Sequence, residues 1–170
     1  MRQIKRYGLM LLLSCIAVDI LLSSVNTNIF AQAAIEEEGI LKEVLPEAAR
    51  FEPVKSGENI LYYKAYGADG VFFGAAFKVS QKGYSSVIET MAGMKKDGTI
   101  TAIKILSHNE TPGLGAGVTE PAFTGQFRNR NIQELDGVEA VTGATVSSKA
   151  VIDSVKKRAE EVIVLIKNTK

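Results

Sequence analysis

Behind three cations in the first six residues, apolar residues run from Tyr7 to Leu22, and weaker apolar character continues to Phe30. A run of this length after cations is typical of a membrane-spanning helix or a signal peptide. A helix over residues 7–30 is long enough to cross a bilayer core of roughly 30 Å. The pattern therefore favours a membrane anchor over residues 1–33, with the N-terminus in the cytoplasm and the rest of the chain outside.

Two other interpretations of this segment fit the residues less well. Ala31–Ala33 has the small-x-small form of a signal cleavage site, but it lies beyond the polar stretch 23–28. A lipoprotein signal ending at Cys15 would need a polar mature start, whereas residues 16–22 stay apolar. Asp19 interrupts the apolar run, and it either pairs with another helix or lies near the outer interface.

After the apolar segment, the spacing changes to that of an amphipathic helix over residues 35–45, which Pro46 ends. Two pairs of segments rich in aromatic and β-branched residues follow. The pairs are 59–66 with 70–79, and 85–94 with 99–106, the second joined through Asp97-Gly98. Because no helix separates these strands, they predict an antiparallel sheet of hairpins with helices over one face.

The C-terminal part of the chain alternates loops and helices. His108–Gly117 holds a proline and three glycines and is predicted to be a loop. A short helix is expected over residues 120–127, then a solvated connector over 128–131. From Ser147 the chain turns helical, with i,i+4 ion pairs Asp153–Lys157 and Lys156–Glu160 outside. The inward stripe of this helix is Val151, Val155, Ala159, Val162, Ile163 and Ile166. The fold class predicted is α+β, with one domain over residues 34–170.

Composition excludes some functions. The 20 Lys and Arg residues nearly balance the 19 Asp and Glu residues, so the chain lacks the basic field of a nucleic-acid-binding protein. The single cysteine, Cys15, allows neither an internal disulfide nor an iron–sulfur centre. One histidine, His108, without a Cys/His/Asp cluster is poor evidence for a metal site, and we place it in a loop near the cofactor. No catalytic or metal-binding residue is predicted.

The stretch from Val141 to Ser148 has the most distinctive chemistry. It places four hydroxyl side chains around Gly143-Ala144, ahead of the last helix. One interpretation is a turn followed by a helix whose N-cap is Ser147 or Ser148. The other is a phosphate site, because a helix N-terminus presents unpaired N–H groups and a partial positive charge. This stretch alone does not separate the two.

Four features together resemble a known family, the flavin-attachment subunits of respiratory electron-transfer complexes. They are the N-terminal anchor, the Gly83-Tyr84-Ser85 segment before a strand and an Asp97-Gly98 hairpin, the loop string His108 to Gly115, and Thr142 to Thr145 with Ser147-Ser148 before a terminal helix. The chain is similar to the G subunit of the Rnf complex and, less closely, to the C subunit of the sodium-pumping quinone reductase.

The resemblance implies one FMN per chain, joined by a phosphoester bond to the hydroxyl of Thr145 by a flavin transferase that uses FAD and Mg²⁺. Glu139 stands where the family often has an Asp, and Asp136 lies slightly earlier, so two carboxylates are candidates to help the transferase bind Mg²⁺. The other predicted FMN contacts are Thr142, Gly143, Ala144, Val146, Ser147, Ser148, Glu110, Thr111, Gly113, Leu114 and Gly115.

The function implied is that of an electron-transfer subunit in an Rnf-type ferredoxin:NAD oxidoreductase complex coupled to Na⁺ or H⁺ translocation. Its expected partners are the iron–sulfur-bearing membrane subunits, the flavin-bearing D subunit, the flavin transferase and membrane lipid. Its expected location is the cytoplasmic membrane, crossed once, with the soluble domain on the periplasmic or extracytoplasmic side. The alternatives are a freestanding membrane-anchored FMN module or sensor, the C subunit of a sodium-translocating quinone reductase, and a structural domain in which the hydroxyl stretch is only a cap.

Overall fold

The computed structural model describes residues 32–168, and most of the predicted anchor lies outside them. Residues from Gly39 onward form one compact unit, and the described residues before it belong to a separate one. A helix spans residues 32–44. After it come β1 (Arg50–Ser56), β2 (Asn59–Tyr66), β3 (Phe72–Lys82), β4 (Val87–Lys95), β5 (Thr99–Ser107), η1 (Gly115–Thr119), α2 (Pro121–Thr124), η2 (Gly125–Phe127), β6 (Arg130–Asn131), η3 (Ile132–Gly137) and α3 (Thr145–Asn168). Within the described residues, no helix is long and apolar enough to cross a membrane.

The six strands form one sheet in the order β1-β2-β3-β4-β5-β6, and every neighbouring pair is antiparallel. Both predicted hairpins are present, so the α+β class is confirmed. The sequence did not reveal β1, which pairs Phe51 with Ala65 and contains Pro53. Because proline cannot donate to the ladder, it is tolerated at a sheet edge, and β1 is the edge strand.

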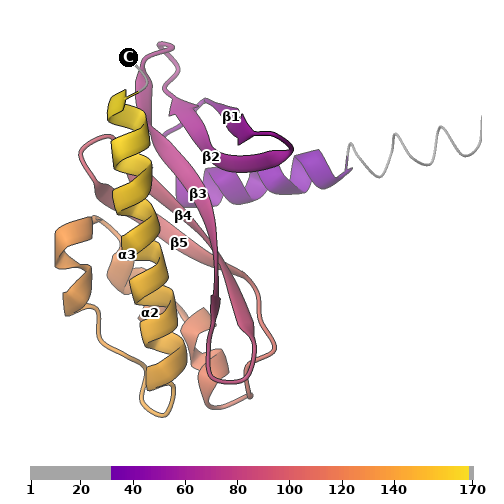
Figure 1. Cartoon of the computed structure of the whole chain (residues 1–170), viewed down its shortest axis with the longest axis vertical. Coiled ribbons are helices and arrows are strands. Elements are labelled where there is room, and N and C mark those ends of the chain that lie inside the picture. Colours follow the sequence, from indigo (N-terminus) through magenta and orange to yellow (C-terminus); the bar gives the residue numbers. More distant parts are fainter. Residues whose placement is uncertain (1–31, 169–170) are drawn as a thin grey trace, which may run out of the picture. The chain divides into compact units, whose positions relative to one another are not determined.

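One face of the sheet packs against α3, which lies along it in Figure 1. The inward stripe predicted for this helix is confirmed for the fully buried Val155, Ala159 and Val162. These side chains share a core with the sheet residues Phe77, Met94 and Ile100. Removal of this apolar surface from water, worth about 25 cal/mol per Å², stabilises the packing of α3 on the sheet.

The opposite face is covered as well, which the sequence did not predict. A second core joins Leu41, Val44 and Leu45 to Tyr63, Ala65, Ala76 and Met91 on the strands. Thr101 Oγ1 donates a hydrogen bond to the carbonyl oxygen of Val44 across this face. The chain can approach so closely because residue 93 is glycine, and a Cβ there would lie 2.6 Å from Thr101 Oγ1. The helix predicted over residues 35–45 is present with bounds 32–44, and Pro46 comes shortly after its end. Ile35, the first residue of the predicted apolar spacing, is exposed.

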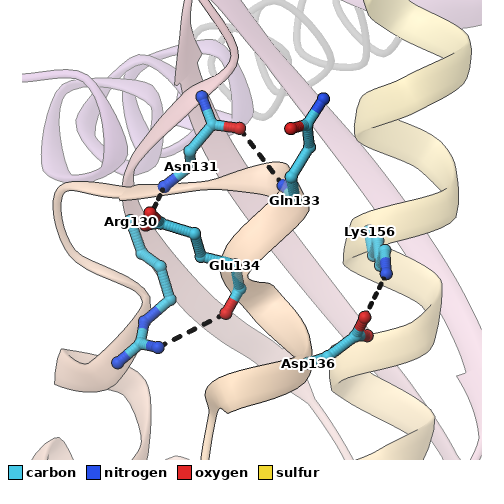
Figure 2. Close-up of polar contacts among 6 residues, drawn as sticks. All are labelled: Arg130, Asn131, Gln133, Glu134, Asp136 and Lys156. Carbon is cyan, nitrogen blue, oxygen red and sulfur yellow. Dashed lines mark hydrogen bonds and ion pairs between the residues drawn. The ribbon is translucent and has the colours of Figure 1, made fainter.

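The segment 128–131, predicted to be a solvated connector, is partly structural. Arg130 and Asn131 form β6, in which Asn131 pairs with Thr99 of β5. Asn131 then caps η3: its side chain accepts a bond from Gln133 N at 3.2 Å, and Glu134 Oε2 accepts one from Asn131 N at 3.4 Å (Figure 2). The prediction was wrong because β6 has only two residues, and the capping pattern Asn-x-x-Glu starts at the second of them, Asn131.

Lys156 on α3 was predicted to pair with Glu160 but binds a different carboxylate. Its Nζ lies 2.6 Å from Asp136 Oδ2 on η3 (Figure 2). The hydrogen bond to Asp136 raises the pKa of Lys156 above its ordinary value, against a smaller opposing effect of burial. Tertiary packing has brought η3 within reach of α3, so Lys156 pairs with a carboxylate of another element rather than of its own helix.

Replacing Asn131 by alanine should lower the free energy of unfolding by about 1 kcal/mol, the usual cost of losing an N-cap side chain. The reason is that Gln133 N loses its acceptor and the reciprocal bond to Glu134 loses its geometry. Urea denaturation measures the change. Gln133→Ala is the matched control, because only the main-chain N–H of Gln133 takes part in the capping hydrogen bonds; equal effects of the two substitutions would contradict the capping role.

Candidate functional site at the start of α3

Three segments that are distant in the sequence meet at the N-terminal end of α3 (Figure 1). They are the β3–β4 turn (83–86), the loop after β5 (108–117) and the turn over 141–144 that leads into α3. Between them lies a cavity of about 360 Å³. Its lining residues are Tyr84, Leu114, Gly115, Gly143, Ala144, Thr145, Val146 and Ser147.

The buried carboxylate of Glu110 joins these segments and is only 5% exposed. Its Oε1 accepts hydrogen bonds from Ser85 N at 3.0 Å, Ser86 N at 2.8 Å and Ser86 Oγ at 3.1 Å. Its Oε2 accepts one from Ser147 Oγ on α3 at 2.7 Å. One side chain therefore fixes the β3–β4 turn and the loop after β5 against the first turn of the helix.

The pKa of Glu110 reflects two opposing effects. Burial raises it, and the hydrogen bonds from Ser147, Ser86 and Ser85 together lower it by more, so the pKa lies below the ordinary value. A carboxylate that accepts several hydrogen bonds is stabilised in its charged form. Glu110 is therefore ionised at neutral pH.

Gly115 allows the loop to approach this network closely. A Cβ at this position would lie 2.9 Å from Ser147 Oγ and would collide with the Glu110 carboxylate. Gly115 is thus needed for packing around Glu110, and it also forms part of the cavity wall.

The turn before α3 closes through a hydrogen bond from Ala144 N to Val141 O at 2.9 Å. Gly143 has φ +79°, a value that favours glycine in the third position of such a turn. The carbonyl of Ala144 accepts the first intrahelical bond, from Ser148 N at 2.8 Å. Ala144 is therefore the N-cap residue, and its methyl side chain offers no acceptor to the N–H groups of Thr145, Val146 and Ser147.

The prediction that Ser147 or Ser148 caps the helix is wrong, because α3 begins two residues earlier, at Thr145. Both serines are fully buried within the first turn. Ser147 Oγ donates to Glu110 and accepts a bond from Tyr84 N at 3.4 Å, and Ser148 Oγ accepts one from Val141 N at 3.0 Å. These hydroxyls hold the surrounding backbone in place.

The structure brings most of the sequence-predicted site residues together, and it also adds one. The predicted residues that line the cavity are Leu114, Gly115, Gly143, Ala144, Thr145, Val146 and Ser147. Thr142, Thr111 and Gly113 are exposed outside this lining, and Glu110 and Ser148 lie buried behind it. Tyr84 lines the cavity although the predicted set omitted it; its signal was the Gly-Tyr-Ser segment at a strand end.

His108 supports the loop rather than the cavity. Its Nδ1 accepts a hydrogen bond from Glu110 N at 3.1 Å. Over residues 32–168, no group of three or more His, Cys, Asp or Glu side chains is arranged to hold a metal ion.

A larger cavity of about 540 Å³ lies at the other end of the strands, between the β2–β3 and β4–β5 turns. Its two acidic side chains stabilise the turns to which they belong: Asp69 accepts a bond from Val71 N, and Asp97 accepts one from Thr99 N. None of the sequence-predicted site residues lines it. We therefore place the functional site at the smaller cavity, where three segments and a buried carboxylate converge.

Comparisons with known proteins agree with this location. Residues 83–160, which include every lining residue of the cavity, match the family model of the FMN-binding domain. Over 143 residues the chain is 36% identical to the G subunit of the ion-translocating oxidoreductase complex of Methanosarcina acetivorans, covering 76% of each chain. The chain belongs to the family of these G subunits. The prediction that the chain is an Rnf-type G subunit with an FMN-binding domain is therefore confirmed.

One further member and a solved structure extend the comparison. The chain is 32% identical over 161 residues to the G subunit of the Na⁺-translocating ferredoxin:NAD⁺ oxidoreductase complex of Acetobacterium woodii, with 76% of this chain and 78% of that one covered. The crystal structure of Shewanella oneidensis NqrC superposes with a TM-score of 0.52 at 18% identity, over 70% of this chain and 72% of that one. The latter similarity shows a shared fold.

Proposed function

We propose that this protein carries one FMN, joined by a phosphoester bond to Thr145 Oγ, and passes electrons within a membrane-bound ferredoxin:NAD oxidoreductase that translocates Na⁺ or H⁺. The single observation that carries the proposal is the position of Thr145. It is an exposed hydroxyl side chain at the first residue of α3, and it lines the cavity. Bound FMN supplies the electron-transfer chemistry, and the protein supplies position and electrostatics.

The local electrostatics suit a phosphodiester at Thr145. The N–H groups of Thr145, Val146 and Ser147 have no acceptor within the helix, and the Ala144 side chain provides none. The 24-residue α3 adds a partial positive charge at this end. Together these features favour an anionic group beside Thr145, as at other helix N-termini that bind phosphate.

The cavity also suits the remainder of the molecule. Its volume of about 360 Å³ lies within the usual range for small-molecule sites, roughly 300–1,000 Å³. Leu114 and Val146 present apolar side chains on its rim that are 51% and 54% exposed. An apolar, planar ring system attached to Thr145 would cover these side chains.

The family resemblance assigns attachment to a flavin transferase, and of the two candidate carboxylates we propose Glu139 as the one that helps it bind Mg²⁺. Asp136 is held by Lys156 at 2.6 Å. Glu139 is exposed, and its backbone is fixed by Gln126, whose side chain accepts from Glu139 N at 2.8 Å and donates to Glu139 O at 3.2 Å. Glu139 therefore offers an exposed side chain on a positioned backbone six residues before Thr145.

Ion translocation requires a membrane, so the complexes that contain these G subunits are membrane-associated. We further propose that residues 1–33 anchor the chain by a single crossing, with the FMN domain on the extracytoplasmic side. Within the complex, the iron–sulfur-bearing membrane subunits would deliver electrons and the flavin-bearing D subunit would exchange them with this chain.

Mass spectrometry of the intact protein, purified from membranes of cells that contain the transferase, tests both parts of the proposal. The expected mass is the full chain plus one FMN less one water. A mass without this addition would contradict covalent attachment. A mass that corresponds to a chain starting at Ala34 would contradict the proposal that residues 1–33 remain as an anchor. It would not affect the conclusion about FMN attachment.

A further inference from the structure

Tyr84 is an exposed aromatic side chain on a fixed backbone. It lies in the β3–β4 turn and is 73% exposed. Its N–H donates to Ser147 Oγ at 3.4 Å, and Gly83 N donates to Ser86 O at 2.7 Å to close the turn. The next two N–H groups are held by Glu110. The backbone is thus tied to α3 and to the loop after β5, while the phenol ring remains uncovered.

The exposed ring of Tyr84 lies among other exposed apolar side chains at the same cavity. Within residues 32–168, eight large hydrophobic side chains are exposed, and Tyr84 is the only aromatic one. Three of the eight, Tyr84, Leu114 and Val146, line the cavity that contains Thr145. Single exposed apolar side chains need no explanation, but three that converge on one cavity mark a surface that a ligand covers.

We propose that Tyr84 contacts the flavin ring of the FMN on Thr145 and holds the ring in the cavity. Tyr84 comes from the β3–β4 turn, Leu114 from the loop after β5 and Val146 from α3, so the ring would be enclosed by three separate segments. An aromatic face suits a planar ring because offset stacking adds to the apolar area buried. This inference rests on the proposed function, since it assumes FMN attachment at Thr145.

The test compares flavinylated full-length protein carrying Tyr84→Leu or Tyr84→Phe with the wild type, by flavin fluorescence, anisotropy and quenching by iodide. A phenol in contact with a flavin quenches its fluorescence, because the excited flavin takes an electron from the phenol and returns it. Tyr84→Leu should raise the fluorescence, lower the anisotropy and increase access of iodide. The expected change in the ratio of docked to undocked ring is roughly two- to twelvefold, the range that one aromatic contact supplies.

Tyr84→Phe separates contact from quenching, since it keeps the ring face and removes the phenol. It should raise the fluorescence while the anisotropy and iodide access stay near wild-type values. Tyr66→Phe is the control, because Tyr66 packs against Phe72 and Arg50 outside this cavity. Attached FMN with all three signals unchanged in Tyr84→Leu would overturn the inference alone. A wild type without covalent FMN would overturn the proposed function and the inference with it.

Discussion

Replacing Thr145 by valine is expected to remove covalent FMN from the protein completely. Valine has nearly the same shape as threonine but lacks the hydroxyl oxygen that a phosphoester requires. Because Thr145 is exposed at the first position of α3, the substitution should leave the fold intact. The measurement is flavin fluorescence that remains with the polypeptide on a denaturing gel, together with the intact mass.

Two matched variants sharpen this result. Thr142→Val removes an exposed hydroxyl three residues earlier, outside the cavity lining, and should keep the FMN. Thr145→Ser keeps a hydroxyl at the same position and should accept FMN. The fraction of protein that carries FMN measures how far the transferase depends on the methyl group of threonine. Fluorescent Thr145→Val protein, or loss of FMN in Thr142→Val alone, would move the attachment point away from Thr145.

Sequence pattern predicted the hairpins because their strands are rich in aromatic and β-branched residues and one turn carries Asp97-Gly98, where Gly98 adopts φ +89°. It missed the edge strand β1, which Pro53 obscures, and β6, which has only two residues. It also missed the second covered face, because Gly93 and Thr101 reveal their close approach to Val44 only after the strands are aligned. Local signals thus located the elements, and long-range packing decided the layers.

At the site, the hydroxyl-rich stretch before α3 identified the location but not the division of roles among its residues. The inward stripe of α3, extended backward from Val151 by three and four residues, reaches Ser148 and Ser147. Their burial was therefore predictable once the helix was known to start at Thr145. The hydrogen bond from Ser147 to Glu110 could not be predicted from the sequence, because the two residues are 37 positions apart.

The second large effect is expected at Glu110. Glu110→Ala should lower the free energy of unfolding by at least about 3 kcal/mol, because it leaves Ser85 N, Ser86 N and the Ser147 hydroxyl without an acceptor. Glu110→Gln keeps the volume and one carbonyl oxygen, so it should cost less. Its amide NH₂ group would face Ser147 Oγ, so the Ser147 hydroxyl would lose the acceptor that Glu110 Oε2 provides.

The pH dependence distinguishes the charge of Glu110 from its shape. Its pKa in the folded protein lies below the ordinary value of 4.5, so its ionised form contributes stability that is fully present above the unfolded-state pKa. As the pH falls through the folded-state pKa, this contribution is lost, and the stability of the wild type should approach that of Glu110→Gln.

Urea denaturation between neutral pH and about pH 3 measures the difference in the free energy of unfolding between the two proteins. Glu120→Gln is the control, since Glu120 is exposed and its side chain caps nothing. A wild-type advantage over Glu110→Gln that stays constant across this range would show that Glu110 acts through packing alone.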